Sequence, residues 1–224
     1  MMAPRLFVVT DPGYADDAIV RAIEAAASGL PRGTLGVQLR DKKRDLVQRR
    51  LLASRLRLVT RAKGAFFVVN GDARLAKDVG ADGVHLGGGA MSIADARLLC
   101  GSRTWVSIAA HGDAAVRAAV REGANAVLVS PIFPTTSAVT VPSQTRVRVP
   151  TEKRARGVEA LEKARAIVGS SGVAIYALGG VTPANAAECV RSGADGVAVI
   201  RAILAADDPA AEAQAFAAAM SELG

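Results

Sequence analysis

Eight apolar runs recur along this chain, and most of the residues capable of chemistry stand just past the end of one of them. The runs cover residues 6–9, 35–39, 65–69, 83–86, 105–109, 126–129, 173–178 and 196–200. Ala-rich stretches of helical character separate most of them. The alternation predicts an α/β chain that forms a single (β/α)8 TIM barrel, because a closed parallel sheet covered on both faces needs strands that are apolar throughout. In such a barrel, all the run ends open onto the face that carries the active site.

One segment interrupts the alternation of apolar runs and helical stretches. We expect one TIM-barrel domain over residues 1–224, with a loop insertion at 138–152 between the sixth strand and its helix. A connection of this length in a compact barrel is usually functional or disordered. Its place at the catalytic face favours a lid, whereas its alternating Thr, Val and Arg residues equally favour a strand that pairs with a partner subunit. Both alternatives stay open here.

Composition narrows the class of protein. With one Trp, two Tyr and five Phe, the core is expected to consist of Ala, Val, Leu and Ile, as in a barrel filled by branched side chains. No apolar stretch is long enough for a membrane span and residues 1–4 lack a signal-peptide pattern, so we expect a cytoplasmic protein without a membrane partner. Cys100 and Cys189 match no metal or redox spacing and are expected to be buried free thiols in helices.

Positive charge is concentrated in one part of the chain. Of a formal net charge of +7, residues 40–63 hold ten Lys or Arg against two Asp. Apolar residues interleave at helical spacing and favour an amphipathic outer helix with a solvated basic face. They are Leu46, Val47, Leu51, Leu52, Leu56 and Val59. Because no nucleic-acid motif or aromatic platform accompanies the charge, we expect no nucleic-acid partner and assign the charge to attraction of an anionic substrate.

The end of the second run carries three groups that suit an anion. Gln38 and Arg40 alternate onto the same face, which points into the barrel mouth, and Lys42 follows just beyond. An amide donor, a guanidinium fork and an ammonium together fit a carboxylate or a phosphate. An ion pair of Arg40 that merely closes the barrel is the equally weighted alternative.

The chain has two histidines. His85 lies within the fourth run between Val84 and Leu86, so we expect a core histidine with a hydrogen-bonding partner. His111 follows the fifth run, where its side chain can reach the mouth. Because histidine both takes and returns a proton near neutrality, His111 is the predicted catalytic residue.

A glycine turn after the seventh run predicts a phosphate site. Gly179 and Gly180 allow backbone N–H groups to approach an anion, and Thr182 with Pro183 is typical of a helix start. Together with the N–H groups at Ile200 and Arg201, this matches the usual phosphate site of such barrels. The alternative is a plain tight turn.

Taken in order, the motifs resemble one family: the thiamin phosphate synthases and their non-synthase relatives, the thiazole tautomerases. The likeness runs from about Leu6 to Ile203. It rests on VQLRDK at 37–42, VVN at 68–70, GADGVHLG at 80–87, SPIFPTTS at 130–137, ALGGVTPAN at 177–185 and GADGVAVI at 193–200. The resemblance implies a phosphorylated thiazole as small-molecule partner, with its phosphate on the loops after strands seven and eight. It also implies substrate contacts from Asn70, Thr135, Ser137 and Lys153, of which Lys153 would replace the family's loop lysine, aligned with Ala138.

Departures from the synthase pattern fall at its metal site. The synthases carry an Asn-Asp pair after strand three and a further Asp past His-Leu-Gly, and these carboxylates hold magnesium. This chain has Asn70-Gly71 and Ala90 there. A hard cation needs oxygen ligands, which Gly and Ala side chains lack, so we expect no resident metal and no other cofactor.

The tautomerases resemble the chain at these positions. They share the Asn-Gly pair, an Arg-Gly-Val segment like 156–158 and a histidine at the position of His111. We therefore expect a metal-independent thiazole tautomerase of thiamin biosynthesis. One alternative, favoured by Gln38 and Lys42, is a magnesium-dependent thiamin phosphate synthase that joins hydroxymethylpyrimidine diphosphate to thiazole phosphate with release of pyrophosphate. A second is a catalytically degenerate, phosphate-binding regulatory barrel, and assembly into a homo-oligomer is also open.

Overall fold

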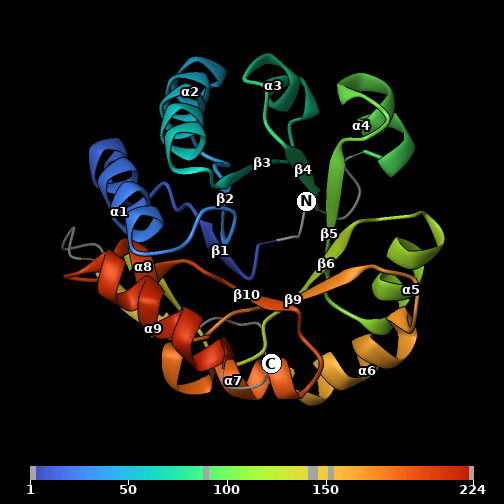
Figure 1. Cartoon of the computed structure of the whole chain (residues 1–224). Coiled ribbons are helices and arrows are strands. Elements are labelled where there is room, and N and C mark those ends of the chain that lie inside the picture. The colour runs from blue at the N-terminus through green and yellow to red at the C-terminus, as the bar shows by residue number, and fades with distance from the viewer. Residues whose placement is uncertain (1–3, 88–90, 141–145, 151–153, 222–224) are drawn as a thin grey trace.

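A closed parallel barrel forms the body of the molecule. The computed structural model describes residues 4–87, 91–140, 146–150 and 154–221. Eight strands close in the order β1-β10-β9-β6-β5-β4-β3-β2, and the helices surround them (Figure 1). The predicted TIM barrel is confirmed.

The barrel strands lie within one residue of the predicted runs. They are β1 (Leu6–Val9), β2 (Leu35–Leu39), β3 (Phe66–Asn70), β4 (Gly83–Leu86), β5 (Trp105–Ala110), β6 (Ala126–Val129), β9 (Ala174–Leu178) and β10 (Gly196–Val199). The helices are α1 (Asp16–Ser28), α2 (Leu46–Lys63), α3 (Ala73–Asp78), α4 (Ile93–Cys100), α5 (Asp113–Arg121), α6 (Glu159–Val168), α7 (Pro183–Arg191), α8 (Arg201–Leu204) and α9 (Pro209–Ser221).

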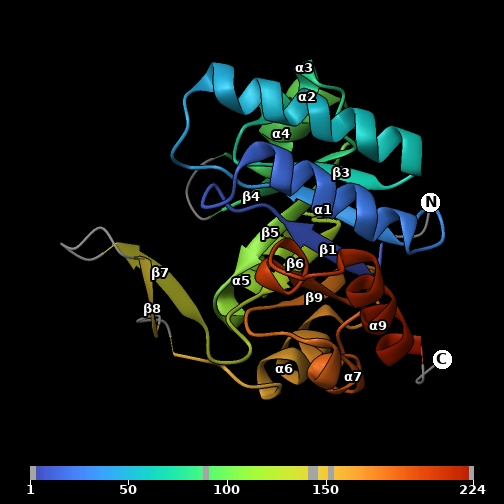
Figure 2. The ribbon, with the colours of Figure 1, turned by 90° about the vertical axis from the view of Figure 1, so that its left-hand side faces the viewer.

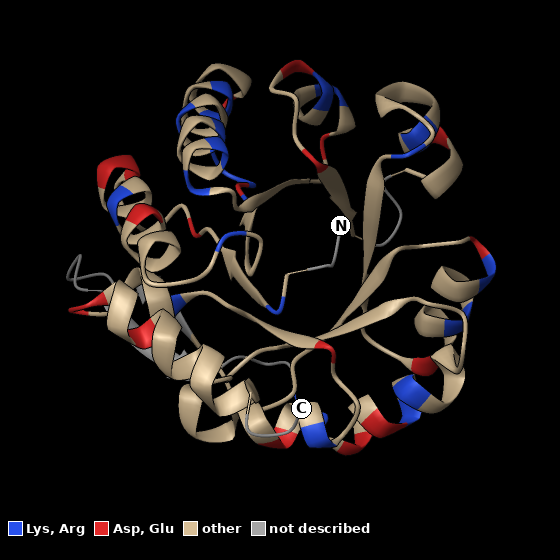
Figure 3. Cartoon of the chain, viewed as in Figure 1, with Lys and Arg blue, Asp and Glu red and all other residues tan. Residues whose placement is uncertain are grey.

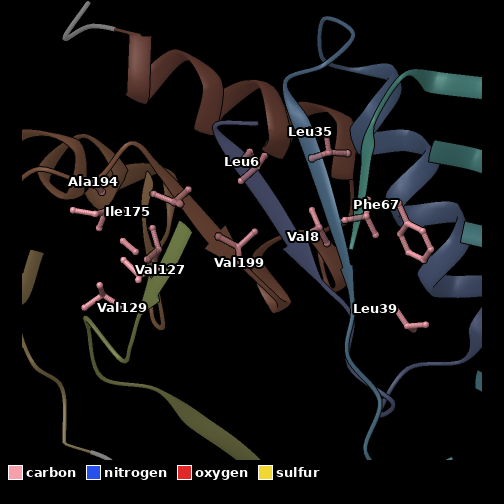
Figure 4. Packing of buried hydrophobic residues seen from close by; sticks show 14 of the residues in the cluster. Leu6, Val8, Leu35, Leu39, Phe67, Val127, Val129, Ile175, Ala194 and Val199 are labelled. Carbon is pink, nitrogen blue, oxygen red and sulfur yellow. The ribbon is translucent and has the colours of Figure 1, made fainter. Parts of the chain in front are cut away.

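Two apolar layers hold the barrel together. Side chains such as Leu6, Val8 and Leu35 point outward and join the helices in one buried cluster (Figure 4). Alternate residues, among them Val9 and Val68, point inward and form a second cluster. Each strand therefore buries both faces, which explains the uninterrupted apolar runs.

The inner layer differs from the expected filling of branched aliphatic side chains. Four aromatic rings from four strands pack together: Phe7, Phe66, Trp105 and Tyr176. Phe7 stacks on Trp105 at 5.8 Å between ring centroids and meets Tyr176 edge-on at 5.0 Å. The hydroxyl of Tyr176 donates to the Pro4 carbonyl oxygen at 2.6 Å. Four of the eight aromatic residues thus gather inside the barrel, where large rings fill the space between the strands.

The insertion forms a hairpin of its own. Strands β7 (Thr136–Thr140) and β8 (Arg146–Pro150) pair antiparallel, with Thr136 opposite Pro150 and Thr140 opposite Arg146. Figure 2 shows this hairpin standing away from the barrel, at the end opposite to the last turn of α9. The predicted strand therefore exists, and it pairs within the chain; neither a lid function nor contact with a partner is tested.

Helix α2 carries the basic stretch (Figure 3). Its buried residues are Leu52, Ala53, Leu56 and Thr60, so the expected apolar face is wrong at Leu46, Val47 and Leu51, which are 50–68% exposed. The helix lies in another rotational phase because the small residues Ala53 and Thr60 fit against the sheet. Five of its cations form ion pairs with carboxylates elsewhere in the fold, on Glu24, Asp17, Asp72, Asp78 and Asp82. Much of this charge is thereby neutralised within the chain.

The described helices include none long and apolar enough to cross a membrane. Cys189 is a buried free thiol in α7, as expected, and burial raises its pKa to about 12. Cys100, at the end of α4, is also free but only partly buried. The cytoplasmic location and the homo-oligomer stay predictions.

Candidate active site

A layer of polar side chains lies above the inner apolar cluster, at the carboxyl ends of the strands. Gln38 stands in register with Val9 and Val68, whose side chains face the barrel axis, so Gln38 faces it too. Asn70, His85 and Ser107 are register neighbours on three adjacent strands. Gln38, His85 and Ser107 are buried. They form a polar floor beneath the mouth.

His85 is held in its neutral form. Its Nδ1 lies 2.8 Å from the Ser107 hydroxyl. Burial, reinforced by the positive charge of Arg40 and by His111 and Lys42, lowers the pKa of His85 to about 4. The prediction of a core histidine with a hydrogen-bonding partner is confirmed.

Arg40 and Lys42 place free cations at the rim. The Thr10 hydroxyl accepts from the Arg40 backbone N–H at 2.9 Å and donates to the Arg40 carbonyl oxygen at 3.2 Å, which ties the end of β2 to β1. Within the described residues, neither the Arg40 guanidinium nor the Lys42 ammonium forms an ion pair or a hydrogen bond. The alternative of a barrel-closing ion pair for Arg40 thus finds no partner in that part of the chain, and both cations are available to an anionic ligand.

A hollow of about 410 Å³ opens between the ends of β2 and β3. Its lining consists of Asp41, Lys42, Arg44, Arg49, Asn70, Gly71 and Asp72. Arg49 comes from the first turn of α2 and lies 3.1 Å from Asp72. Sequence reasoning missed Arg49 by assigning it to a solvated face. Asp72 could have indicated this role, because its carboxylate stands just past β3 and can pair with a cation from a neighbouring element.

His111 directly follows β5, two strands from β3 around the barrel, and is exposed. Its Nδ1 lies 3.1 Å from the carbonyl oxygen of Ser130 and 3.3 Å from the Ser130 hydroxyl. A proton on Nδ1 donates to that carbonyl and leaves Nε2 open to a ligand. The catalytic role of His111 stays a prediction.

The glycine turn after β9 has a structural reason as well. Gly179 and Gly180 have φ of +101° and +67°. A Cβ on Gly180 would lie 2.7 Å from the Phe133 Cβ and from the Pro134 carbonyl oxygen, so only glycine lets the two loops touch. Thr182 caps α7 and Pro183 is its first residue, as predicted. Phosphate binding by this turn is not tested.

The other predicted contacts are spread around the mouth. Ile200 precedes the short helix α8, and Arg201 begins it. Thr135 is partly buried just before β7, and Ser137 is the second residue of that strand. Lys153 lies outside the described residues, so its replacement of the loop lysine is neither supported nor contradicted.

The carboxylates near the mouth do not suit a divalent cation. Gly71 has no ligand atom in its side chain, and Ala90, outside the described residues, has none either. Asp72 accepts from the Leu75 N–H with one oxygen and pairs with Arg49 through the other. Asp11 accepts from the Gly13 N–H at 2.8 Å. No cluster of three metal-ligating side chains exists within the described residues. The donor set therefore does not fit magnesium.

Comparison with known proteins decides the family. A sequence profile described as "Thiamine monophosphate synthase" matches residues 6–203. The chain belongs to the thiamine monophosphate synthase family. A protein of Chloroflexus aurantiacus named thiamine-phosphate synthase is 39% identical over 97% of this chain and 93% of its own length. One of Chromobacterium violaceum, with the same name, is 37% identical over 96% and 97%. The structure of a thiamine phosphate pyrophosphorylase from Pyrococcus furiosus matches with a TM-score of 0.79 at 27% identity, over 98% of this chain and 96% of that one.

These relatives correct the predicted activity. We expected a thiazole tautomerase because Gly71, Ala90 and His111 resemble that branch. Many family members that match over most of the chain are instead named thiamine-phosphate synthase, including those of Chloroflexus and Chromobacterium. The error arose from giving a few metal-site positions more weight than the similarity of the whole barrel. The findings support an enzyme of thiamine biosynthesis.

Proposed function

We propose that this chain is a thiamine-phosphate synthase, which joins hydroxymethylpyrimidine diphosphate to thiazole phosphate and releases pyrophosphate. The observation that carries the proposal is the pair of cations on the rim, Arg40 and Lys42, with no partner in the described chain, above a buried polar floor. Names of relatives that are 36–40% identical agree with it.

The reaction forms one bond and breaks one. The thiazole ring nitrogen bonds to the pyrimidine methylene carbon, while the bond from that carbon to the diphosphate oxygen breaks and its electron pair leaves with the diphosphate. Negative charge grows on the leaving group, so fixed cations stabilise the transition state more than the ground state. Arg40 and Lys42 supply such charge.

Gln38 is suited to orient a heterocycle. The residue is 3% exposed, and its side chain makes no hydrogen bond within the described residues. Its amide therefore offers both a donor and an acceptor to a ligand in the mouth. We assign it to the polar edge of the pyrimidine.

The remaining groups serve the thiazole phosphate and the departing diphosphate. In this proposal the Gly179–Gly180 turn and the N–H groups of Ile200 and Arg201 hold the thiazole phosphate, and Asn70, Thr135 and Ser137 contact the substrates. His111 in its doubly protonated form would donate from Nε2 to the departing diphosphate while its Nδ1–H donates to the Ser130 carbonyl oxygen.

The test is formation of thiamine phosphate from the two substrates by purified protein, followed by chromatography. Lys42→Gln should reduce kcat/KM by about tenfold or more, since it removes a charge-assisted contact. Lys43→Gln, which changes the neighbouring exposed lysine, serves as the matched control and should retain activity. No product under any metal condition, with both substrates still bound, would contradict the proposal and favour a binding protein.

A further inference from the structure

Three cationic side chains, Lys42, Arg44 and Arg49, line the hollow between β2 and β3. Its volume is about 410 Å³, and Asn70 and Gly71 at the end of β3 form one wall. Gly71 contributes no carboxylate to this wall. A Cβ on Gly71 would meet no atom within 4 Å, so the absent side chain leaves open space.

Three of the four oxygens of the carboxylates that line the hollow, on Asp41 and Asp72, are engaged by groups of the described chain. Asp72 accepts from the Leu75 N–H at 2.9 Å and pairs with Arg49 at 3.1 Å. Asp41 accepts from the N–H groups of Lys43 and Arg44 at 2.9 and 3.0 Å through one oxygen. Its second oxygen is buried, makes no hydrogen bond within the described residues and lies 3.4 Å from the Arg44 Nε. A metal ion would have to break the Asp72 contacts, and it would find the one remaining Asp41 oxygen beside the positive charge of Arg44.

Arg49 is the side chain best placed to bind a diphosphate in this hollow without a metal ion. Its side chain is 24% exposed, and Asp72 holds one terminal nitrogen. Its Nε is buried and has no hydrogen-bonding partner within the described residues. The guanidinium therefore keeps donors that no group of the described chain uses. Lys42, on the same lining, has no ion pair in the described chain and adds a second charge.

We infer that the Arg49 guanidinium, positioned by Asp72, is the resident cation that binds the diphosphate group in this hollow, so that diphosphate binding needs no divalent metal. The inference rests on the proposed function for the identity of the ligand. A guanidinium binds phosphate oxygens through a planar fork and stays charged at every working pH. As the carbon–oxygen bond breaks, Arg49 and Lys42 stabilise the negative charge that develops on the released pyrophosphate.

The experiment is calorimetric titration with inorganic pyrophosphate, once in EDTA and once with excess Mg²⁺. The wild-type chain should bind pyrophosphate in EDTA, with a Kd at most a few times that in Mg²⁺. Arg49→Gln should weaken binding in EDTA by about tenfold or more, the scale of a lost charge-assisted hydrogen bond. Arg49→Lys, which keeps the charge but not the fork, should fall between the two.

The matched control lies one residue further along the same helix. Arg50 forms an ion pair with Asp78 at the surface, where both side chains are more than 40% exposed. Arg50→Gln removes an equal charge from α2 and should leave pyrophosphate binding within about twofold of the wild type, because an exposed pair contributes little. Thermal unfolding of each variant checks that the barrel is intact.

The outcomes separate this inference from the proposed function. Pyrophosphate binding that requires Mg²⁺ in the wild-type chain, or an Arg49→Gln variant that binds as well as Arg50→Gln, would overturn the role of Arg49 even if thiamine phosphate is formed. Metal-free binding that depends on Arg49 without any product would support the inference and refute the synthase. Should Arg49→Gln fail to fold, the wild-type titrations in EDTA and Mg²⁺ still decide the metal requirement.

Discussion

The Arg201 guanidinium connects the end of the barrel to the base of the hairpin. Its Nη1 donates to the Thr136 carbonyl oxygen at 2.8 Å and to the Thr136 hydroxyl at 2.7 Å. Thr136 is the first residue of β7, so this contact lies where the hairpin leaves the barrel. One terminal nitrogen of Arg201 is thus already engaged by the chain, and its other donors are what a phosphate could use.

Replacing Arg201 by Ser should loosen the hairpin. An isolated two-stranded hairpin is marginal in water, so loss of this connection should speed amide hydrogen exchange in 136–140 by about tenfold. The measurement is exchange followed by mass spectrometry. Arg121→Ser is the control, because within the described residues Arg121 pairs only with its exposed neighbour Glu122. Unchanged exchange in 136–140 would show that other contacts hold the hairpin.

The His111→Gln variant tests the proton donor. The side chain is exposed, so folding should be unaffected, while kcat for thiamine phosphate formation should fall by about 10²-fold, the usual contribution of a positioned acid or base. Steady-state kinetics of both proteins is the measurement. Equal kcat in the variant at every pH would remove His111 from the mechanism.

Features that depend on burial within a strand could be predicted from the sequence. The eight strands were predicted to within one residue because parallel strands buried on both faces leave continuous apolar runs. Alternation along β2 likewise placed Gln38 on the inner face. His85 was predicted as a core residue from its apolar neighbours.

Features that depend on the three-dimensional arrangement of separate elements could not. Phe7 and Trp105 are far apart in the sequence and stack only because of the strand register. The pairing of Arg49 with Asp72 requires the phase of α2, which the buried Ala53 and Thr60 set and which apolar spacing alone misplaced. The predicted activity was wrong for a related reason. A single position such as Gly71 shows that a metal-binding carboxylate is missing, but it does not show which cationic side chain could bind the diphosphate instead.

His85 should make the fold sensitive to acid. Its pKa of about 4 in the folded chain lies below the ordinary 6.5, so the unfolded chain binds the proton more tightly. The contribution of His85 to the free energy of unfolding is therefore fully present above pH 6.5. It is lost as the pH falls towards 4, and at pH 4.5 the loss is about 2 to 3 kcal/mol. Urea unfolding at pH 7 and pH 4.5 should show a smaller loss for His85→Gln than for the wild type. An equal loss in both would assign the acid sensitivity to other groups.

The two glycines Gly180 and Gly71 form a natural pair for separating backbone strain from packing. Their φ angles are nearly equal, +67° and +73°, so alanine suffers the same left-handed strain of about 1 kcal/mol at either position. At Gly180 the new Cβ would also lie 2.7 Å from atoms of Phe133 and Pro134, whereas at Gly71 it meets nothing within 4 Å. Gly180→Ala should therefore lower the free energy of unfolding by about 2 kcal/mol more than Gly71→Ala, the scale of overpacking in a tight site. Urea unfolding at pH 7 measures both values. Equal losses of the free energy of unfolding would mean that the loops after β6 and β9 can move apart without cost. A substitution at Gly180 could then test phosphate binding without also destabilising the fold.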